Sequence, residues 1–193
     1  MYNTVLESYQ RSVQTQMRAA ENLPELILNA SELIVDCLKD GRKVIALGLG
    51  LSACNANVLV NHLLTHVKLP RPIFNATLLE NSSFQTICNL QNQGDKSYAC
   101  YLEAIALSGD VLVVFCEKQA PKPVLKALDR AIEKGLKIIA FTSSDDDLIS
   151  SKLAPDDVKI PAPTNNSLRV LESHLIAQNI LCEIVEQRVI FGG

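Results

Sequence analysis

The hydrophobic positions of this chain follow two alternating patterns. Short apolar runs that end in turn residues predict buried strands, and five such runs lie at residues 43–47, 73–79, 110–116, 137–142 and 157–161. Between these runs, apolar residues recur every three or four positions, which is typical of amphipathic helices. We expect these helices at residues 48–66, from 81 onward, and at 96–107, 121–134 and 165–189. The alternation predicts an α/β fold with a doubly wound five-stranded parallel sheet flanked by helices.

Two extra helices are predicted before the first strand, at residues 2–20 and 24–40. The second begins at Pro24, a residue suited to a first helical turn, and ends before Gly41. The first carries a narrow apolar stripe formed by Val5, Tyr9, Val13 and Met17. Two helices ahead of the sheet leave more apolar surface than a sheet edge would cover, so residues 1–40 are expected to pack against another subunit.

The last predicted helix is apolar on two faces. One face carries Leu168, Leu171, Leu175, Cys182, Val185 and Val189, and the other carries Val170, Ala177, Leu181 and Ile184. A helix of this kind is usually buried on two sides, and for a terminal helix the second side is most simply a neighbouring subunit. We therefore expect residues 1–193 to form a single domain that assembles into a homo-oligomer.

A candidate anion site follows the first strand, where Gly48, Gly50 and Ser52 form a glycine turn into a helix. At the carboxyl end of a parallel strand, free backbone N–H groups and a serine hydroxyl can face an anionic ligand. The simpler alternative is that Ser52 only caps the helix.

Composition narrows the classes of function. The chain is 48% hydrophobic and 20% charged with a net charge of −3, which favours a globular protein and argues against direct binding of nucleic acid. No segment resembles a signal peptide or a membrane span, so a cytoplasmic protein is expected. The six cysteines contain no C-x-x-C pair and are expected to be reduced.

Several phrases, in order along the chain, resemble one family. They are G-x-G-x-S-A at residues 48–53, GDVLxxF at 109–115, KIIAFT at 137–142 and R-x-x-E-x-H at 169–174. Together with the two leading helices they resemble the SIS (sugar isomerase) domain, and within it the phosphoheptose isomerase branch. Residues 12–16, the Pro155-x-Asp157-Val158 phrase and an aliphatic-Phe tail are most similar to the group of DnaA initiator-associating proteins, DiaA.

The resemblance also shows where the family's sugar-phosphate loops have changed. Leu49 and Leu51 replace the Asn and the third Gly of the first loop, G-N-G-G-S-A, and the second loop has lost every hydroxyl of S-T-S-G-N-S. A serine-rich loop holds a phosphate through hydroxyl and N–H donors, whereas a glutamate repels it. The remnant of the ligand-binding site comprises Gly48, Gly50, Ser52, Cys116, Glu117 and Lys118.

The catalytic positions are also altered. The isomerases carry H-x-x-x-E and Q-x-x-x-x-x-x-x-H motifs that bind a divalent metal and provide the acid/base pair. Here the equivalent positions are Val58, His62, Leu171 and Asn179. Aldose–ketose isomerisation needs a group that moves a proton between adjacent carbons, so the chain is expected to be non-catalytic, without a metal or cofactor.

The resemblance therefore implies a DiaA-like scaffold that binds the replication initiator DnaA, is a homotetramer and promotes assembly of the initiation complex. Its expected partner-binding residues are Tyr9, Gln14, Gln16, Ile190 and Phe191. The terminal pair has a simpler alternative, docking on its own domain. The alternative function is a sedoheptulose 7-phosphate isomerase, or a sugar-phosphate-binding protein, with a remodelled site.

Four further features admit two interpretations each. His62 and His66 could share a metal on one helix face, or pack as polar residues. Arg169, Glu172 and His174 could form a salt-bridged cluster or a catalytic remnant. Cys116 resembles a nucleophile at a strand end, although a passive thiol is simpler. The acidic run at residues 145–147 is expected to be a solvated loop.

Overall fold

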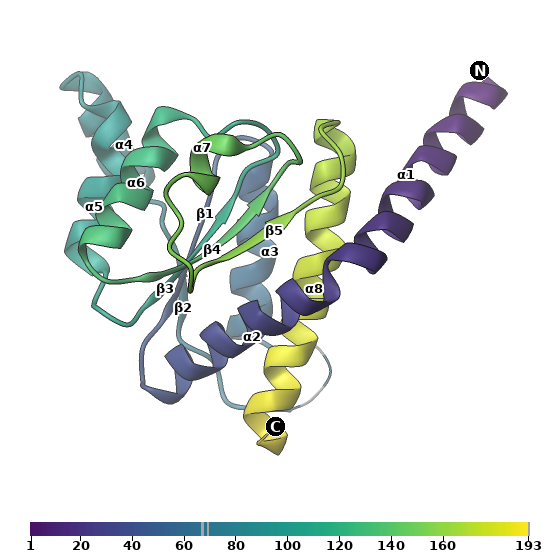
Figure 1. The fold of residues 1–193 in the computed structure, drawn as a ribbon. Coiled ribbons are helices and arrows are strands. Elements are labelled where there is room, and N and C mark those ends of the chain that lie inside the picture. The colour runs from purple at the N-terminus through teal and green to yellow at the C-terminus, as the bar shows by residue number, and fades with distance from the viewer. Residues whose placement is uncertain (67, 69, 193) are drawn as a thin grey trace.

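A five-stranded, all-parallel sheet lies at the centre of the computed structural model, which describes residues 1–66, 68 and 70–192. The strand order is β2-β1-β3-β4-β5 (Figure 1). The strands are β1 Val44–Gly48, β2 Ala76–Leu78, β3 Val111–Phe115, β4 Lys137–Thr142 and β5 Val158–Pro161. The predicted α/β fold and five-stranded parallel sheet are confirmed.

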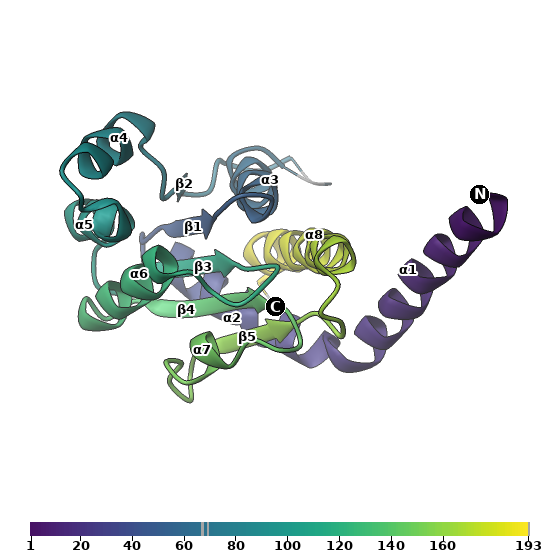
Figure 2. The same cartoon turned by 90° about the horizontal axis from the view of Figure 1, so that it is seen from above.

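Helices cover both faces of this sheet, as right-handed crossovers between parallel strands require. One face packs against α2 (Pro24–Lys39), α3 (Ser52–Leu64) and α8 (Ser167–Phe191). The other packs against α5 (Ser97–Ile105), α6 (Lys122–Glu133) and the short α7 (Asp147–Ser150). Figure 2 shows α5 and α6 on one side of the strands and α8 on the other. The remaining helices are α1 (Tyr2–Asn22), α4 (Ser82–Leu90) and the 3₁₀ turn η1 (Gly94–Lys96).

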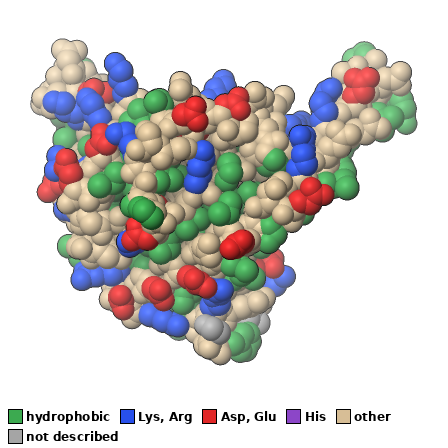
Figure 3. All heavy atoms as spheres, viewed as in Figure 1, with side chains coloured by type: hydrophobic (Ala, Val, Ile, Leu, Met, Phe, Trp, Pro, Cys, Tyr) green, Lys and Arg blue, Asp and Glu red, His purple; other side chains and the backbone are tan. Residues whose placement is uncertain are grey.

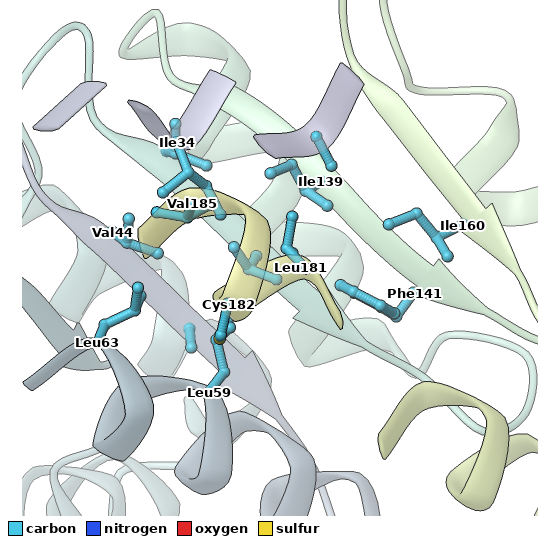
Figure 4. Close-up of a cluster of buried hydrophobic side chains, with 14 of the residues drawn as sticks. Ile34, Val44, Leu59, Leu63, Ile139, Phe141, Ile160, Leu181, Cys182 and Val185 are labelled. Carbon is cyan, nitrogen blue, oxygen red and sulfur yellow. The ribbon is translucent and has the colours of Figure 1, made fainter. Parts of the chain in front are cut away.

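The α8 face holds a core of aliphatic side chains from elements far apart in sequence. Figure 4 shows Leu181, Cys182 and Val185 of α8 near Leu59 of α3 and Ile34 of α2. Leu59 and Leu181 have no exposed surface, so truncating either to alanine would remove about 2–5 kcal/mol of stability. This packing fixes α3 and α8 on the sheet and so positions the candidate site.

Two predicted elements have wrong boundaries. Strand β2 begins at Ala76 rather than residue 73, because the N–H of Phe74 donates to the Leu63 carbonyl (3.1 Å) instead of joining the sheet. Helix α3 ends at Leu64 rather than at residue 66.

The acidic run is also not a solvated loop throughout. Asp146 has no exposed surface, and its side chain accepts a hydrogen bond from the N–H of Ile149 (3.0 Å), so it caps α7. A short helix capped in this way leaves no long apolar pattern in the sequence.

Helix α1 projects from the rest of the molecule (Figures 1 and 2). It contacts its own chain through the buried Thr15 and Ala19 and through Ser12, whose hydroxyl donates to Glu172 of α8 (2.5 Å). Within the described part of the chain, no helix is long and apolar enough to cross a membrane.

Candidate functional site

The sheet has a topological switch point between β1 and β3. The chain leaves β1 toward β2 on one side and returns to β3 on the other, and Gly48 pairs in register with Phe115. Open parallel sheets bind ligands beyond the carboxyl ends of the strands at such a point. The two loops that begin here are those predicted from the sequence, residues 49–51 and 116–121.

The N–H groups that follow the first loop donate to carbonyl groups of the loop itself. Gly50 has a φ of +59°, and a Cβ on Gly48 would lie 2.3 Å from the Ser52 carbonyl oxygen, so both positions require glycine. The N–H groups of Ser52, Ala53 and Cys54 donate to the carbonyls of residues 49, 50 and 51, each at 3.2 Å. Three of the amides that could face an anion, those of residues 52–54, are therefore bonded within a tight turn.

Ser52 does not cap its helix. The N-cap position is Leu51, which has no capping side chain, and Ser52 is the first helical residue with 1% of its surface exposed. Its hydroxyl donates to the Glu117 carboxylate and accepts a hydrogen bond from the Glu117 N–H at 3.1 Å. The predicted capping role is wrong because the side chain turns across the switch point to the second loop.

The second loop brings a carboxylate and a buried thiol to this edge. Glu117 is half-buried, whereas Lys118 is exposed. Cys116 is 4% exposed, and burial, with the nearby Asp146 and Glu117 carboxylates, raises the pKa of its thiol. A thiol that stays protonated is a poor nucleophile, which favours the passive interpretation of Cys116.

Little open space remains at the switch point. A hollow of about 120 Å³ lies on the β2 side, and another of about 180 Å³ lies over the second loop, with Leu49 in the wall of both. Sites for small organic ligands usually measure about 300–1,000 Å³. Leu51 is 56% exposed. The two leucines thus stand where the family's loop carries a small and a polar residue.

Two of the four positions equivalent to the isomerase catalytic residues offer no side-chain ligand for a metal. Val58 and Leu171 offer only hydrocarbon side chains, and the Leu171 carbonyl accepts from Asn55 Nδ2 (3.2 Å). The Nδ1 atom of His62 and the Oδ1 atom of Asn179 are buried without a hydrogen-bond partner among the described residues. In the same described residues, no three His, Cys, Asp or Glu side chains are grouped to hold a metal.

The structure also argues against a metal shared by His62 and His66. His66 lies beyond the last residue of α3 and is exposed, whereas His62 is half-buried within the helix. The two side chains therefore do not share one helix face, as the i, i+4 spacing had predicted.

The cluster predicted at the start of α8 forms without its histidine. Arg169 and Glu172 make an ion pair at 2.9 Å. His174 is 1% exposed, its Nε2 lies 3.0 Å from the Thr142 carbonyl oxygen, and its ring packs against Phe141. Burial lowers the pKa of His174 to about 4, so the neutral ring is the stable form. It is a buried structural residue.

A second region, on the outer surface of the helices, is apolar and open. The α1 stripe, defined as Val5, Tyr9, Val13 and Met17, is exposed at every position, from 56% to 70%. Figure 3 shows hydrophobic side chains on this projecting helix.

An apolar groove of about 290 Å³ continues from α1 and α2 onto α8. Gln16 and Ser173 line it, and the Gln16 Nε2 and Ser173 Oγ atoms are buried without partners among the described residues. Of the predicted partner residues, Tyr9 and Gln16 are seven apart and share this side of α1. Gln14 lies on the polar face with Arg11 and Arg18.

The tail is also uncovered. Phe191 is 71% exposed and Ile190 is 38% exposed in the last turn of α8. Phe191 borders a hollow of about 280 Å³ with Lys68, Glu183, Glu186 and Gln187. Such exposure disfavours the alternative in which the terminal pair docks on its own domain.

Sequence reasoning missed three features of these regions: the Ser52–Glu117 contact, the capping role of Asp146 and the unpartnered atoms of the groove. The first joins residues 65 positions apart. No local pattern could have indicated it, because neither loop by itself specifies which strands become neighbours.

Comparison with known proteins gives a consistent family. The family model described as SIS domain matches residues 8–143. An uncharacterized protein from Haemophilus influenzae is 36% identical over 188 residues, which is 97% of each chain. The DnaA initiator-associating protein DiaA from Enterobacter sp. is 30% identical over 188 residues, 96% of this chain and 95% of that one.

Solved structures give the same fold. A phosphoheptose isomerase from Francisella tularensis has a TM-score of 0.90 at 26% identity, covering 96% of this chain and 98% of its own. Phosphoheptose isomerase GmhA from Neisseria gonorrhoeae has a TM-score of 0.88 at 24% identity over the same shares of the two chains, a likeness of fold alone. The resemblance predicted from the sequence is confirmed.

Proposed function

This chain belongs to the SIS domain family, and from that premise we propose that it is a non-catalytic, DiaA-like scaffold. It binds the replication initiator DnaA and promotes assembly of initiation complexes. The observation that carries this proposal is the state of the switch point. The N–H groups of residues 52–54 are bonded within the first loop, the open space is divided into two small hollows, and the catalytic positions lack an acid/base pair.

The outer helices supply the surface that a scaffold needs. We infer that residues 1–193 form one SIS domain, that the α1 stripe and the groove pack against other copies, and that the assembly is a tetramer. Several identical sites on one rigid body raise the effective concentration of bound partners without any new contact. The acidic composition supports a protein partner rather than bare nucleic acid, and the similarity to DiaA supports a cytoplasmic site of action.

The exposed tail is the sharpest test of partner binding. Phe191→Ala is expected to weaken binding of DnaA at least tenfold, because exposed aromatic anchors often contribute most of the affinity of an interface. The measurement is the dissociation constant of immobilised full-length protein for DnaA. Leu90→Ala is the matched control, since Leu90 is 80% exposed on α4 but lies outside the predicted partner residues.

Light scattering should give the same mass for wild type and both variants, so that a loss of affinity reports the contact and not the assembly. If Phe191→Ala and Leu90→Ala bind DnaA equally well, the tail is not part of the site. If wild type shows no binding of DnaA at all, the proposed function is wrong.

The second candidate is a sugar-phosphate isomerase or sugar-phosphate-binding protein. It is favoured by the similarity to the Francisella tularensis phosphoheptose isomerase over 96% of the chain. The two functions separate in one assay, in which sedoheptulose 7-phosphate and a divalent metal are incubated with the protein. We expect no conversion above that of a protein-free control; conversion that His62→Ala abolishes would establish the isomerase.

A further inference from the structure

At the switch point, the Glu117 carboxylate is bonded to Ser52 as a bound anion would be, although both residues belong to this chain. The Glu117 carboxylate accepts from the Ser52 hydroxyl, and the Glu117 N–H donates back to the same oxygen at 3.1 Å. These reciprocal hydrogen bonds join the two loops across the space where the strand order reverses. Ser52 is 1% exposed, so solvent has little access to the contact.

The fold brings the two residues together through the register of β1 and β3. Gly48 and Phe115 are paired, so the loops after them leave the sheet side by side, and Ser52 becomes the first residue of α3. The N-terminus of a helix carries a positive partial charge and stabilises an anion placed there. A carboxylate bonded to Ser52 therefore occupies the position that favours negative charge.

We propose that Glu117 is an internal anion that occupies this position and excludes an external phosphate or other oxyanion. The inference goes beyond the proposed function, because it concerns what keeps an oxyanion out of the switch point, whatever partner the outer surface binds. A free anion would have to displace a tethered one, whose effective concentration is high, and would meet its charge at close range.

The surrounding space supports the same assignment. The hollow over the second loop, about 180 Å³, is lined by Glu117 itself together with Leu49, Cys116 and Lys118. Because the N–H groups of residues 52–54 are bonded within the first loop, the Ser52 hydroxyl is the donor that the structure shows turned to the anion. Removing the carboxylate would free that donor and enlarge the hollow.

Replacing Glu117 tests the proposal with inorganic phosphate as the probe. The melting temperature of wild type, Glu117→Ser and Glu117→Gln is measured in phosphate buffer at about 20 mM and in chloride of equal ionic strength. Wild type should show no phosphate-specific shift. Glu117→Ser should melt lower in chloride and regain several degrees in phosphate, and titration calorimetry should show phosphate binding at least tenfold tighter than to wild type.

Glu117→Gln keeps a side chain that can accept from Ser52 but removes the charge. It should fold as wild type does and bind phosphate more weakly than Glu117→Ser but more tightly than wild type, which keeps the test valid if the serine variant is unstable. Gln119→Ala is the matched control: Gln119 is exposed in the same loop and lines the same hollow, so the variant opens space without removing a charge and should behave as wild type in both salts.

Two results would overturn the inference. One is an equal phosphate response in wild type and the Glu117 variants, whether both bind or neither does. The other is a loss of stability in Glu117→Ser that phosphate does not reverse, since a purely structural contact would behave in that way. Binding of DnaA should be unchanged in Glu117→Gln, so this result and that of the tail experiment are independent.

Discussion

The carboxyl edge of the sheet and the outer surface of the helices differ in how many of their polar groups have hydrogen-bond partners and how much of their apolar surface is covered. At the edge, the amides of residues 52–54 and the Ser52 hydroxyl all find partners within the same chain. On the outer surface, the α1 stripe is exposed, and the Gln16 and Ser173 side chains have buried polar atoms without partners among the described residues. Exposed apolar patches of this kind mark sites of association.

This difference makes the outer surface, rather than the edge of the sheet, the better candidate for contact with other molecules. A sugar-phosphate site at the edge of the sheet would need free hydrogen-bond donors and a cavity. Here the edge is closed, whereas the helices and the tail are open. Three predictions test this contrast, beginning with the largest expected effect.

The α1 stripe should be essential for assembly. Val13→Asp places a charge in an apolar contact, where an unpaired carboxylate is strongly unfavourable, so the assembly should dissociate completely. Light scattering after size-exclusion chromatography should then give a mass near the 21.1 kDa of one chain.

Gln14→Asp is the matched control, because it adds the same charge on the polar face of α1 and should leave the assembly intact. If wild type is itself monomeric at micromolar concentration, or if both variants remain assembled, the outer surface is not the open region that the contrast requires.

The second prediction concerns pH and the buried His174. Its pKa is about 4 in the folded chain and near 6.5 when unfolded, so between these values the unfolded state binds the extra proton. Stability contributed by the neutral ring is complete above pH 6.5 and falls as the pH falls toward 4. From pH 7 to pH 5 the free energy of unfolding should decrease by about 2 kcal/mol through this group.

Denaturant unfolding at one protein concentration measures this decrease. His174→Gln should reduce the pH dependence by that amount, whereas His66→Gln, at an exposed position, should leave it unchanged. Equal pH dependence in wild type and His174→Gln would show that burial does not keep the His174 ring neutral.

The smallest expected effect concerns Gln178, which has no exposed surface and no partner for either amide atom among the described residues. Gln178→Met replaces a buried, unbonded amide by an apolar chain of similar size. We expect the free energy of unfolding to rise by about 1 kcal/mol. Gln187→Met, exposed on the same helix, should change it little. A loss of stability in Gln178→Met would instead show that this amide is bonded in the assembled protein.

Much of the fold could be predicted because its signals are local. Apolar runs marked the five strands, and three-four spacing marked the long helices, so errors in these elements were confined to their ends, such as the start of β2. That strand was predicted too long because the contact that shortens it joins Phe74 to Leu63 of the preceding helix. The short α7 was missed, since its cap Asp146 looked like any acidic loop residue.

The candidate site was predicted less completely. The two loops and their altered residues were found from the sequence, because the resemblance assigns each position. The role of Ser52 was wrong, since capping is the usual function of a serine at a helix start. The predicted cluster at Arg169 and Glu172 formed, but His174 points inward to Thr142. Which side a helical residue faces depends on packing against β4, which no local spacing specifies.

The sequence by itself determined the order of strands and helices, the glycines of the first loop and membership of the family. These depend on periodicity and backbone conformation, which neighbouring residues encode. Only the tertiary structure decided that Ser52 and Glu117 are in contact, that the N–H groups of residues 52–54 are bonded within the first loop, and that the α1 stripe is exposed. These outcomes depend on which strands become neighbours in the sheet. The strand order determines which residues far apart in the chain come within hydrogen-bond distance of each other.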